Sequence, residues 1–228
     1  MSGAVVVTGA SRGIGRRIAE ELLDRSRPVV LVARSREPLE ELAGDRENAF
    51  VLTRDLVDDP DIVGPATKLA GPLGGLVHAA GVALHAPLAE VTDRQIEVMH
   101  RLHFVAPLVM ARSLARAGRA ASIVHIASTL GLRPAPGRLV YSATKAALIS
   151  MTRTLALELA SSGIRVNAVA PGAVDTEMMS RADLEALAPR HPLGIGAPSD
   201  VAGAALYLLD APWATGTILT LDGGLTAG

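Results

Sequence analysis

The stretch AVVVTGASRGIG, residues 4–15, decides the fold of this chain. It opens with a short valine-rich run, which is typical of a buried strand, and leads through a glycine-containing turn into the amphipathic pattern IGRRIAEELLDR, residues 14–25. Glycines allow a tight turn and a close approach of the backbone to a ligand. The helix that follows offers free N–H groups and the positive end of its dipole to a phosphate. Such a turn could be purely structural, but its place between the first strand and the first helix favours phosphate binding.

The glycines of this turn are spaced G-x-x-x-G-x-G, which differs from the common dinucleotide-binding pattern G-x-G-x-x-G. The turn is also not the P-loop of nucleoside triphosphatases, because no Gly-Lys-Ser/Thr follows it. We predict that a bound cofactor contacts Gly9, Ser11, Arg12, Gly13, Ile14 and Gly15.

Six further apolar runs follow along the chain, separated by amphipathic segments of helical length: PVVLVA (28–33), AFVLT (49–53), GLVHAA (75–80), SIVHIAS (122–128), IRVNAVA (164–170) and TILTLDGG (217–224). Near-continuous apolar strands alternating with helices predict a doubly wound (Rossmann) α/β fold, a parallel sheet with helices on both faces. No repeat or linker divides the sequence, so we expect residues 1–228 to form one domain. In such a sheet, ligands bind beyond the carboxyl ends of the strands.

The composition argues against several functional classes. The 228 residues carry a net charge of -1 and include only 2% aromatic side chains, so neither a basic surface nor stacking platforms for nucleic acid are present. The chain has no Cys, which excludes disulfides, thiolate nucleophiles and zinc-cysteine sites, and we expect no metal. No signal peptide and no apolar run of membrane-spanning length is evident. We therefore expect a cytoplasmic protein without nucleic-acid or membrane partners.

The end of the second strand predicts which nicotinamide cofactor is used. NAD-binding folds place an acidic residue there for the ribose 2′-hydroxyl, whereas a 2′-phosphate requires positive charge. Here Arg34 and Ser35 follow the strand without an acid, and Arg12 lies in the glycine turn. These could be ordinary surface arginines in an arginine-rich chain, but the missing acid favours NADP(H). After the third strand, Asp55 could accept from the adenine amino group or simply cap the next helix.

Tyr141 and Lys145 are spaced for acid–base chemistry. Four residues apart, they share one face of a helix, and a neighbouring ammonium favours the phenolate form of a tyrosine. Ser128 ends the fifth strand, where its hydroxyl could bond a substrate oxygen. The chain contains only two lysines, Lys68 and Lys145, and otherwise uses arginine for positive charge. A lysine at position 145 therefore favours a functional need for its amine. The Tyr-x-x-x-Lys spacing often arises by chance, but a serine upstream and a cofactor turn favour a catalytic role.

Six motifs in order then resemble the short-chain dehydrogenase/reductase family, in particular its 3-oxoacyl-[acyl-carrier-protein] reductase-like members: TGASRGIG, HAAG (78–81), Ser128, YSATK (141–145), IRVNAVAPGAVDTEM (164–178) and the terminal LDGG. The resemblance implies that Lys145 also holds the nicotinamide ribose. It further implies cofactor contacts from Asp55, Leu56, His78, Ala80, Gly81, Tyr141, Pro171, Gly172, Val174 and Thr176. It implies a homodimer or homotetramer built through the helices near 92–117 and 141–161 and the C-terminal strand.

Two histidines depart from the family pattern, which has Asn at both positions. His78 is interpreted as a tolerated substitution at a strand end. His103 replaces the fourth catalytic residue, whose main-chain carbonyl in the family binds a water of the proton relay. Counting four residues back from Pro107, which has no N–H, predicts that the His103 carbonyl is free to keep that relay. The imidazole could add a group that titrates near neutral pH. Alternatively, His103 is a packed histidine beside a kink.

The sequence therefore predicts an NADP(H)-dependent ketoreductase, which reduces a ketone to a secondary alcohol with Tyr141 as proton donor and Ser128, Lys145 and His103 in support. The alternative is a catalytically silent NADP(H)-binding sensor of the same fold. A loop near residues 178–198 contains Leu184, Leu187, Leu193 and Ile195, which favour an apolar substrate portion or packing against the domain equally. The substrate and its stereochemistry stay open.

Overall fold

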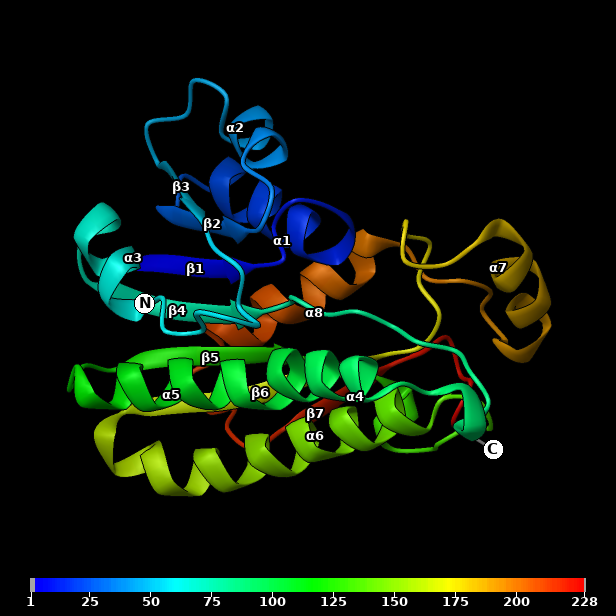
Figure 1. The fold of residues 1–228 in the computed structure, drawn as a ribbon. Helices are drawn as coiled ribbons and strands as arrows, with labels where there is room; N and C mark the ends of the chain where they lie inside the picture. The colour runs from blue at the N-terminus through cyan, green and yellow to red at the C-terminus, as the bar shows by residue number, and fades with distance from the viewer. Residues whose placement is uncertain (1–2, 228) are drawn as a thin grey trace.

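The computed structural model describes residues 3–227 as a doubly wound α/β fold. Seven parallel strands form one sheet in the order β3-β2-β1-β4-β5-β6-β7 (Figure 1). Their bounds are β1 (Ala4–Thr8), β2 (Val29–Ala33), β3 (Ala49–Thr53), β4 (Leu73–His78), β5 (Ala121–Ile126), β6 (Ile164–Pro171) and β7 (Ile218–Leu221). The predicted fold and its seven strands are confirmed, and the order reverses beside β1, where the glycine turn follows.

Side chains that alternate along the strands fill two apolar layers. Val5 and Val7 pack with α1 (Gly13–Asp24), α2 (Glu37–Ala43) and α8 (Pro198–Asp210) on one face of the sheet. Val6 packs with the other face, which is covered by α3 (Val63–Ala70), α5 (Ala106–Arg116) and α6 (Leu139–Leu159). Strands buried on both sides explain why the sequence runs are continuously apolar rather than alternating.

The predicted helix 92–117 is interrupted. It consists of α4 (Asp93–His100), a π-helical turn η2 (Arg101–Val105) and α5. Thr92 and Gln95 cap the start of α4 reciprocally, as the capping-box pattern requires. In the middle, the Ala106 N–H bonds the carbonyl of Arg101, five residues back rather than four. A π turn inserts one extra residue and so changes which groups face the sheet.

The second long helix, α6, runs without interruption through its 21 residues. Its buried face contacts β6 and α4, and its N-terminal half lies against the short helix η3 (Thr129–Gly131). An alanine in place of Gly131 would put its Cβ 2.8 Å from the carbonyl carbon of Lys145, so η3 and α6 touch backbone to backbone. This contact fixes the segment after β5 against the first turns of α6.

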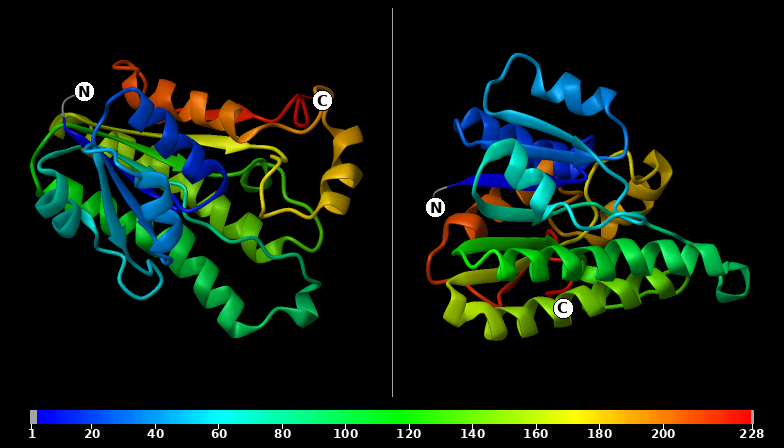
Figure 2. Two further views of the ribbon diagram at one scale, coloured as in Figure 1. Left: turned by 90° about the horizontal axis from the view of Figure 1, so that it is seen from above. Right: turned by 60° about the vertical axis from the view of Figure 1, so that its left-hand side comes forward.

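The segment after β6 projects beyond the carboxyl end of the sheet (Figures 1 and 2). It contains α7 (Arg181–Leu187) and η5 (Ala188–Arg190). Leu184 is buried in the protein, whereas Leu193 is 87% exposed to solvent. The apolar residues of this loop therefore do not share one environment. The remaining short helices are η1 (Leu88–Glu90) and η4 (Ala160–Ser162). Among residues 3–227, no helix combines the length and apolar character needed to cross a membrane.

Candidate active site

The glycine turn lies between the carboxyl ends of β1 and β4. Gly9 has a φ of +69°, and a Cβ there would lie 2.9 Å from the Cα of Ala80. A Cβ on Gly15 would collide with the carbonyl oxygen of Gly9. Both positions therefore need glycine for the turn to fit under β4 and for α1 to start at Gly13. The N-terminus of α1 opens at the edge of the sheet where ligands bind in this architecture.

The loop after β6 comes back to the same turn. A Cβ on Gly13 would lie 3.4 Å from Thr176 Cγ2, so these segments touch although they are far apart in sequence. Val174 pairs with Gly196 in an isolated bridge that holds the loop. Gly172 packs closely against His191 and Asp222. The structure thus brings Thr176, one of the predicted residues after β6, to the glycine turn.

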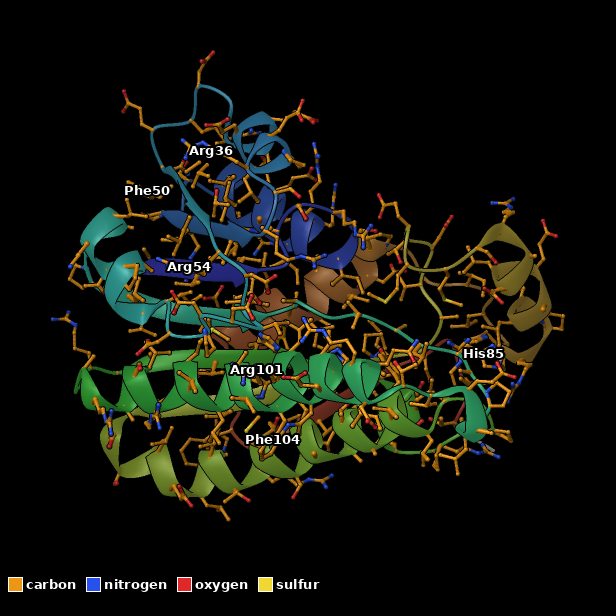
Figure 3. All side chains as sticks on the ribbon, viewed as in Figure 1. Arg36, Phe50, Arg54, His85, Arg101 and Phe104 are labelled. Atoms are coloured by element: carbon orange, nitrogen blue, oxygen red, sulfur yellow. The ribbon has the colours of Figure 1, made fainter. Side chains whose placement is uncertain are left out.

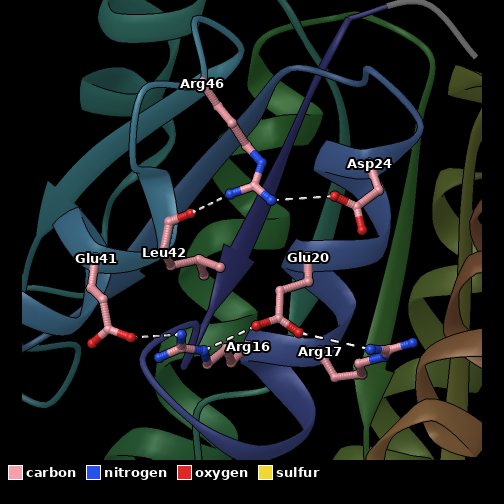
Figure 4. Close-up of polar contacts among 7 residues, drawn as sticks. All are labelled: Arg16, Arg17, Glu20, Asp24, Glu41, Leu42 and Arg46. Atoms are coloured by element: carbon pink, nitrogen blue, oxygen red, sulfur yellow. Dashed lines mark hydrogen bonds and ion pairs between the residues drawn. The ribbon is translucent and has the colours of Figure 1, made fainter.

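Arginines near the end of β2 divide into paired and unpaired groups. Figure 4 shows Arg16 bonded to Glu20 and Glu41, and Figure 3 labels Arg36 and Arg54, which pair with Glu40 and Asp59. In contrast, Arg12 and Arg34 are exposed and form no ion pair with any other residue of 3–227.

Asp55, predicted to face the adenine, uses its carboxylate locally. Its Oδ1 accepts a hydrogen bond of 2.9 Å from the backbone N–H of Val57. The carboxylate therefore stabilises the turn after β3, and its other oxygen has no bond within the described chain. It does not cap the next helix, because α3 begins at Val63 with Ile62 as its N-cap residue, so the capping alternative is wrong.

Ser128, Tyr141 and Lys145 meet at the end of β5. Ser128 is hydrogen-bonded to the Tyr141 side chain, and its hydroxyl also accepts the N–H of Leu130 at 3.1 Å. Lys145 Nζ donates to the carbonyl of Ile126 at 2.8 Å and lies 5.7 Å from the centre of the Tyr141 ring. The four-residue spacing on α6 thus places phenol and ammonium side by side, as predicted.

Burial shifts both ionisable groups of this cluster toward their neutral forms. It raises the pKa of Tyr141, against smaller opposing effects of the Ser128 hydrogen bond and the Arg138 charge. It lowers the pKa of Lys145 to about 8. The expectation that the ammonium makes Tyr141 easier to ionise is therefore corrected for this structure, because desolvation dominates. A tyrosine that stays protonated at neutral pH is suited to donate a proton.

His103 is fully buried beside this cluster. Its Nε2 receives the N–H of Val82 at 3.2 Å, and its Nδ1 lies 3.0 Å from Thr144 Oγ1. Its ring stands edge-on to the Tyr141 ring with centres 5.7 Å apart. Burial, together with the nearby Lys145 and His78, lowers the pKa of His103 well below its ordinary value. The expectation of a group that titrates near neutral pH is wrong for this reason.

His78 joins the glycine turn to the π turn. Its Nε2 lies 3.0 Å from the carbonyl oxygen of Leu102, and its Nδ1 lies 3.1 Å from Thr8 Oγ1. In the five-residue register of η2, the missing N–H of Pro107 falls opposite Leu102 rather than His103. Pro107 therefore leaves the Leu102 carbonyl free to accept from His78, and a proton relay through the His103 carbonyl stays a prediction.

A family model described as short chain dehydrogenase matches residues 3–186. The chain belongs to this family. It is 37% identical over 234 residues to carbonyl reductase family member 4 of Danio rerio, which covers 99% of this chain and 98% of that protein. It is 34% identical over 233 residues, with the same coverage, to the 3-oxoacyl-[acyl-carrier-protein] reductase of Bos taurus.

Several solved structures share the whole fold. A 4-hydroxyisoleucine dehydrogenase complexed with NADH superposes with a TM-score of 0.92 at 28% identity, covering 100% of both chains. Structures similar to this chain hold NADH in some cases and NADPH in others. The protein is thus an oxidoreductase of a family that uses a nicotinamide dinucleotide.

Sequence reasoning about this short-chain dehydrogenase missed several groups at the site. Thr8 accepts the N–H groups of Ala79 and Ala80, both at 3.1 Å. Thr144 donates to the carbonyl of Tyr141 at 3.0 Å. Thr144 lies within the quoted YSATK motif and Thr8 directly precedes Gly9, so proximity to the motifs was the available signal.

Proposed function

We propose that this short-chain dehydrogenase is an NADPH-dependent carbonyl reductase, which converts a ketone, such as a 3-oxoacyl group, to a secondary alcohol. The observation that carries the proposal is the cluster of Ser128, Tyr141 and Lys145 after β5, at the same edge of the parallel sheet as the glycine turn after β1. Bound NADPH would supply the hydride that reaches the carbonyl carbon. This chain's residues would supply the proton and hold the oxygen.

Tyr141 donates its hydroxyl proton to the substrate oxygen as negative charge develops there. Ser128 holds the same oxygen by a hydrogen bond that strengthens with that charge. Lys145 binds the ribose next to the nicotinamide and presents a positive charge to the resulting phenolate. The raised pKa of Tyr141 supports the reductive direction, since the acid form is present at neutral pH.

Arg34 and Arg12 support the choice of NADPH. Both are exposed and unpaired within the described chain, whereas Arg36 beside them is bonded to Glu40. A 2′-phosphate at the end of β2 would meet two free guanidinium groups and no carboxylate. Ser35, at the same end of β2, would donate to that phosphate.

The remaining cofactor contacts follow the family resemblance. The glycine-turn residues and Thr176 would face the diphosphate. Asp55 and Leu56 would face the adenine, and the backbone at His78, Ala80 and Gly81 would border the adenosine ribose. Pro171, Gly172 and Val174 would enclose the nicotinamide.

Turnover with a chemically diverse ketone panel tests the proposal, with NADPH and NADH compared. We expect Tyr141→Phe to lose about 10³-fold in kcat, because general acid catalysis contributes roughly 10²- to 10⁴-fold. Tyr207→Phe is the matched control, since Tyr207 is the second of the two tyrosines and is 64% exposed. Full activity of Tyr141→Phe would refute the assignment. Tight NADPH binding without turnover on any ketone would favour the sensor alternative.

Arg34→Ala tests the cofactor preference separately. Loss of a charge-assisted hydrogen bond costs about 1.5–3 kcal/mol, so the KM for NADPH should rise roughly 10- to 100-fold while that for NADH stays near its original value. Arg36→Ala is the control, because its side chain is already bonded to Glu40. Wild-type saturation at far lower NADH than NADPH would contradict the role of Arg34.

We also propose a homodimer or homotetramer. Leu139 and Leu157 on α6 and Leu108 on α5 are exposed large apolar side chains, which an association through these helices would cover. Light scattering tests this directly, and a monomer at micromolar concentration would contradict it.

A further inference from the structure

We propose that His103 positions Tyr141 through its imidazole side chain, and that His78 and Pro107 fix the π turn that holds His103 in place. The inference rests on the proposed reductase function, because it concerns the proton donor of that reaction. It assigns His103 no proton-carrying step.

The hydrogen bonds determine which nitrogen of His103 carries the proton. A backbone N–H only donates, so Nε2 accepts from Val82 and Nδ1 bears the hydrogen. Nδ1–H then donates to Thr144 Oγ1, whose own hydrogen goes to the carbonyl of Tyr141. The chain of bonds therefore runs in one direction, from the loop after β4 to the first turn of α6.

The pocket around His103 is built for an uncharged ring. Both nitrogens are occupied, and a Cβ on Gly81 would lie only 3.3 Å from Nε2. Lys145 Nζ lies 3.8 Å from the same Cβ position on Gly81, so the ammonium is near the ring and would repel a positive charge on it. Edge-on contact with the Tyr141 ring completes the enclosure. An imidazole with no free nitrogen can hold Tyr141 in place but has no lone pair left to move a proton.

His78 holds the π turn by an equally directional set of bonds. The Leu102 carbonyl only accepts, so Nε2–H of His78 donates to it and Nδ1 accepts the hydroxyl hydrogen of Thr8. Thr8 in turn accepts two backbone N–H groups after β4. Pro107 leaves the Leu102 carbonyl without a helical partner in the π register. The two histidines thus act on adjacent residues, His78 on the backbone at 102 and His103 itself at 103.

A second buried histidine forms the same kind of hydrogen bond to a threonine of α6, and it provides a control for the bond between His103 and Thr144. His125 Nδ1 lies 2.9 Å from Thr152 Oγ1, which donates to the carbonyl of Leu148 at 2.8 Å. This His–Thr–carbonyl arrangement repeats that of His103, Thr144 and Tyr141 two turns further along α6. Its hydrogen bonds do not involve Tyr141, although the His125 ring lies edge-on to His78 with centres 6.4 Å apart. Thr152→Val therefore controls for the loss of a buried histidine–threonine bond.

The first test measures the ionisation of Tyr141 by tyrosinate absorbance in a Tyr207→Phe background, where Tyr141 is the one remaining tyrosine. We expect Thr144→Val to raise the Tyr141 midpoint by about 0.5–1 pH unit, because the ring moves from Ser128 and Arg138, which lower its pKa. Thr144→Ser should restore the midpoint, and Thr152→Val should not move it. Equal midpoints in Thr144→Val and Thr152→Val would overturn the inference. This readout needs no turnover, so it separates failure of the inference from failure of the proposed function.

The second test separates the two nitrogens of His103. An Asn amide reaches the place of Nδ1 and a Gln amide that of Nε2, so His103→Asn keeps the Thr144 arm and His103→Gln keeps the Val82 arm. We expect His103→Gln to lose about 10-fold in kcat and His103→Asn to lose less, since small displacements of a reacting group are costly. The double variant His103→Gln/Thr144→Val should lose no more than either single variant. Equal losses for Asn and Gln, or additive losses in the double variant, would contradict a role through Thr144.

Discussion

Two long helices border the active site, and they carry their functional groups in different ways. Helix α6 keeps one register over its whole length, so the four-residue spacing of Tyr141 and Lys145 translates directly into neighbouring side chains. The α4–η2–α5 segment changes register at residues 101–105. Here the carbonyl that lies opposite Pro107 in the five-residue register is that of Leu102, which counting by four does not predict. Spacing arguments hold where the helical register is constant, and a π turn adds a second carbonyl to consider.

The two helices also have different roles. Helix α6 presents Tyr141 and Lys145, which are proposed to react. The interrupted segment supplies the Leu102 carbonyl, which binds His78, and the His103 side chain, which binds Thr144. A buried carbonyl without a partner costs about 1–3 kcal/mol, so the π turn is tolerated because His78 donates to Leu102. The interruption thus depends on a residue from a strand, which helix propensity alone does not reveal.

The largest expected effect is acid sensitivity of the fold. Burial lowers the pKa of His78 and His103 well below their ordinary values and that of His125 to about 3. Below about pH 6.5 the unfolded chain takes up three protons that the folded chain refuses, so stability is retained above that pH and falls as the pH drops. The slope should approach about 4 kcal/mol per pH unit roughly one unit below that pH, where the histidines of the unfolded chain are almost fully protonated. Urea unfolding midpoints between pH 8 and pH 5 measure it.

A flat stability profile between pH 6.5 and pH 5 would show that these histidines charge in the folded state. The variant His125→Gln compares the two helices. It removes the histidine that is bonded to Thr152 of α6, and it retains His78 and His103, which belong to or contact the interrupted segment. It should reduce the slope by about one third.

The next largest effect is expected at His78. The variant His78→Leu has a side chain of similar size but leaves the Leu102 carbonyl without a hydrogen-bond donor. It should therefore destabilise the fold by about 2–3 kcal/mol. Adding Pro107→Ala supplies an N–H opposite that carbonyl in the π register and should restore about 1 kcal/mol. Urea unfolding of the four proteins in this double-mutant cycle measures the coupling. Strictly additive effects would mean that Pro107 and His78 do not share the Leu102 carbonyl.

The regular helix is tested at its contact with η3. Gly131→Ala places a methyl group against the backbone of Lys145 and Ala146, so it should cost about 1–3 kcal/mol and reduce kcat by moving Ser128 away from Tyr141. Gly203→Ala in α8 is the control, because a Cβ there would meet no described atom within 4 Å, and it should stabilise by about 0.5–1 kcal/mol. Unchanged kcat in Gly131→Ala would show that η3 does not position Ser128.

Most of the fold followed from the sequence because buried strands and the glycine turn are local patterns. The seven strands lie within a few residues of their predicted bounds, and Tyr141, Lys145 and Ser128 lie together as expected. The break in the 92–117 helix was signalled by Pro107, but its register was not. A π turn is decided by what satisfies the freed carbonyl, and here that group is His78, 24 residues away from Leu102. Burial likewise reversed the expected direction of the Tyr141 pKa, since desolvation depends on packing that a motif does not encode.

The single variant Pro107→Ala is expected to have the smallest effect on stability. A change in its activity can therefore be assigned to the register of the interrupted segment rather than to loss of the fold. Alanine favours helix and restores an N–H, so the free energy of unfolding should change by less than about 1 kcal/mol. The new N–H also permits the four-residue register of an α-helix, in which it would bond the His103 carbonyl; this register competes with the π turn and shifts His103 relative to Thr144. We therefore expect kcat to fall several-fold while stability is maintained, measured by steady-state reduction and urea unfolding on the same preparation. The opposite result, unchanged kcat with increased stability, would contradict this prediction. It would show that a change of register in the α4–η2–α5 segment does not affect the groups that hold Tyr141.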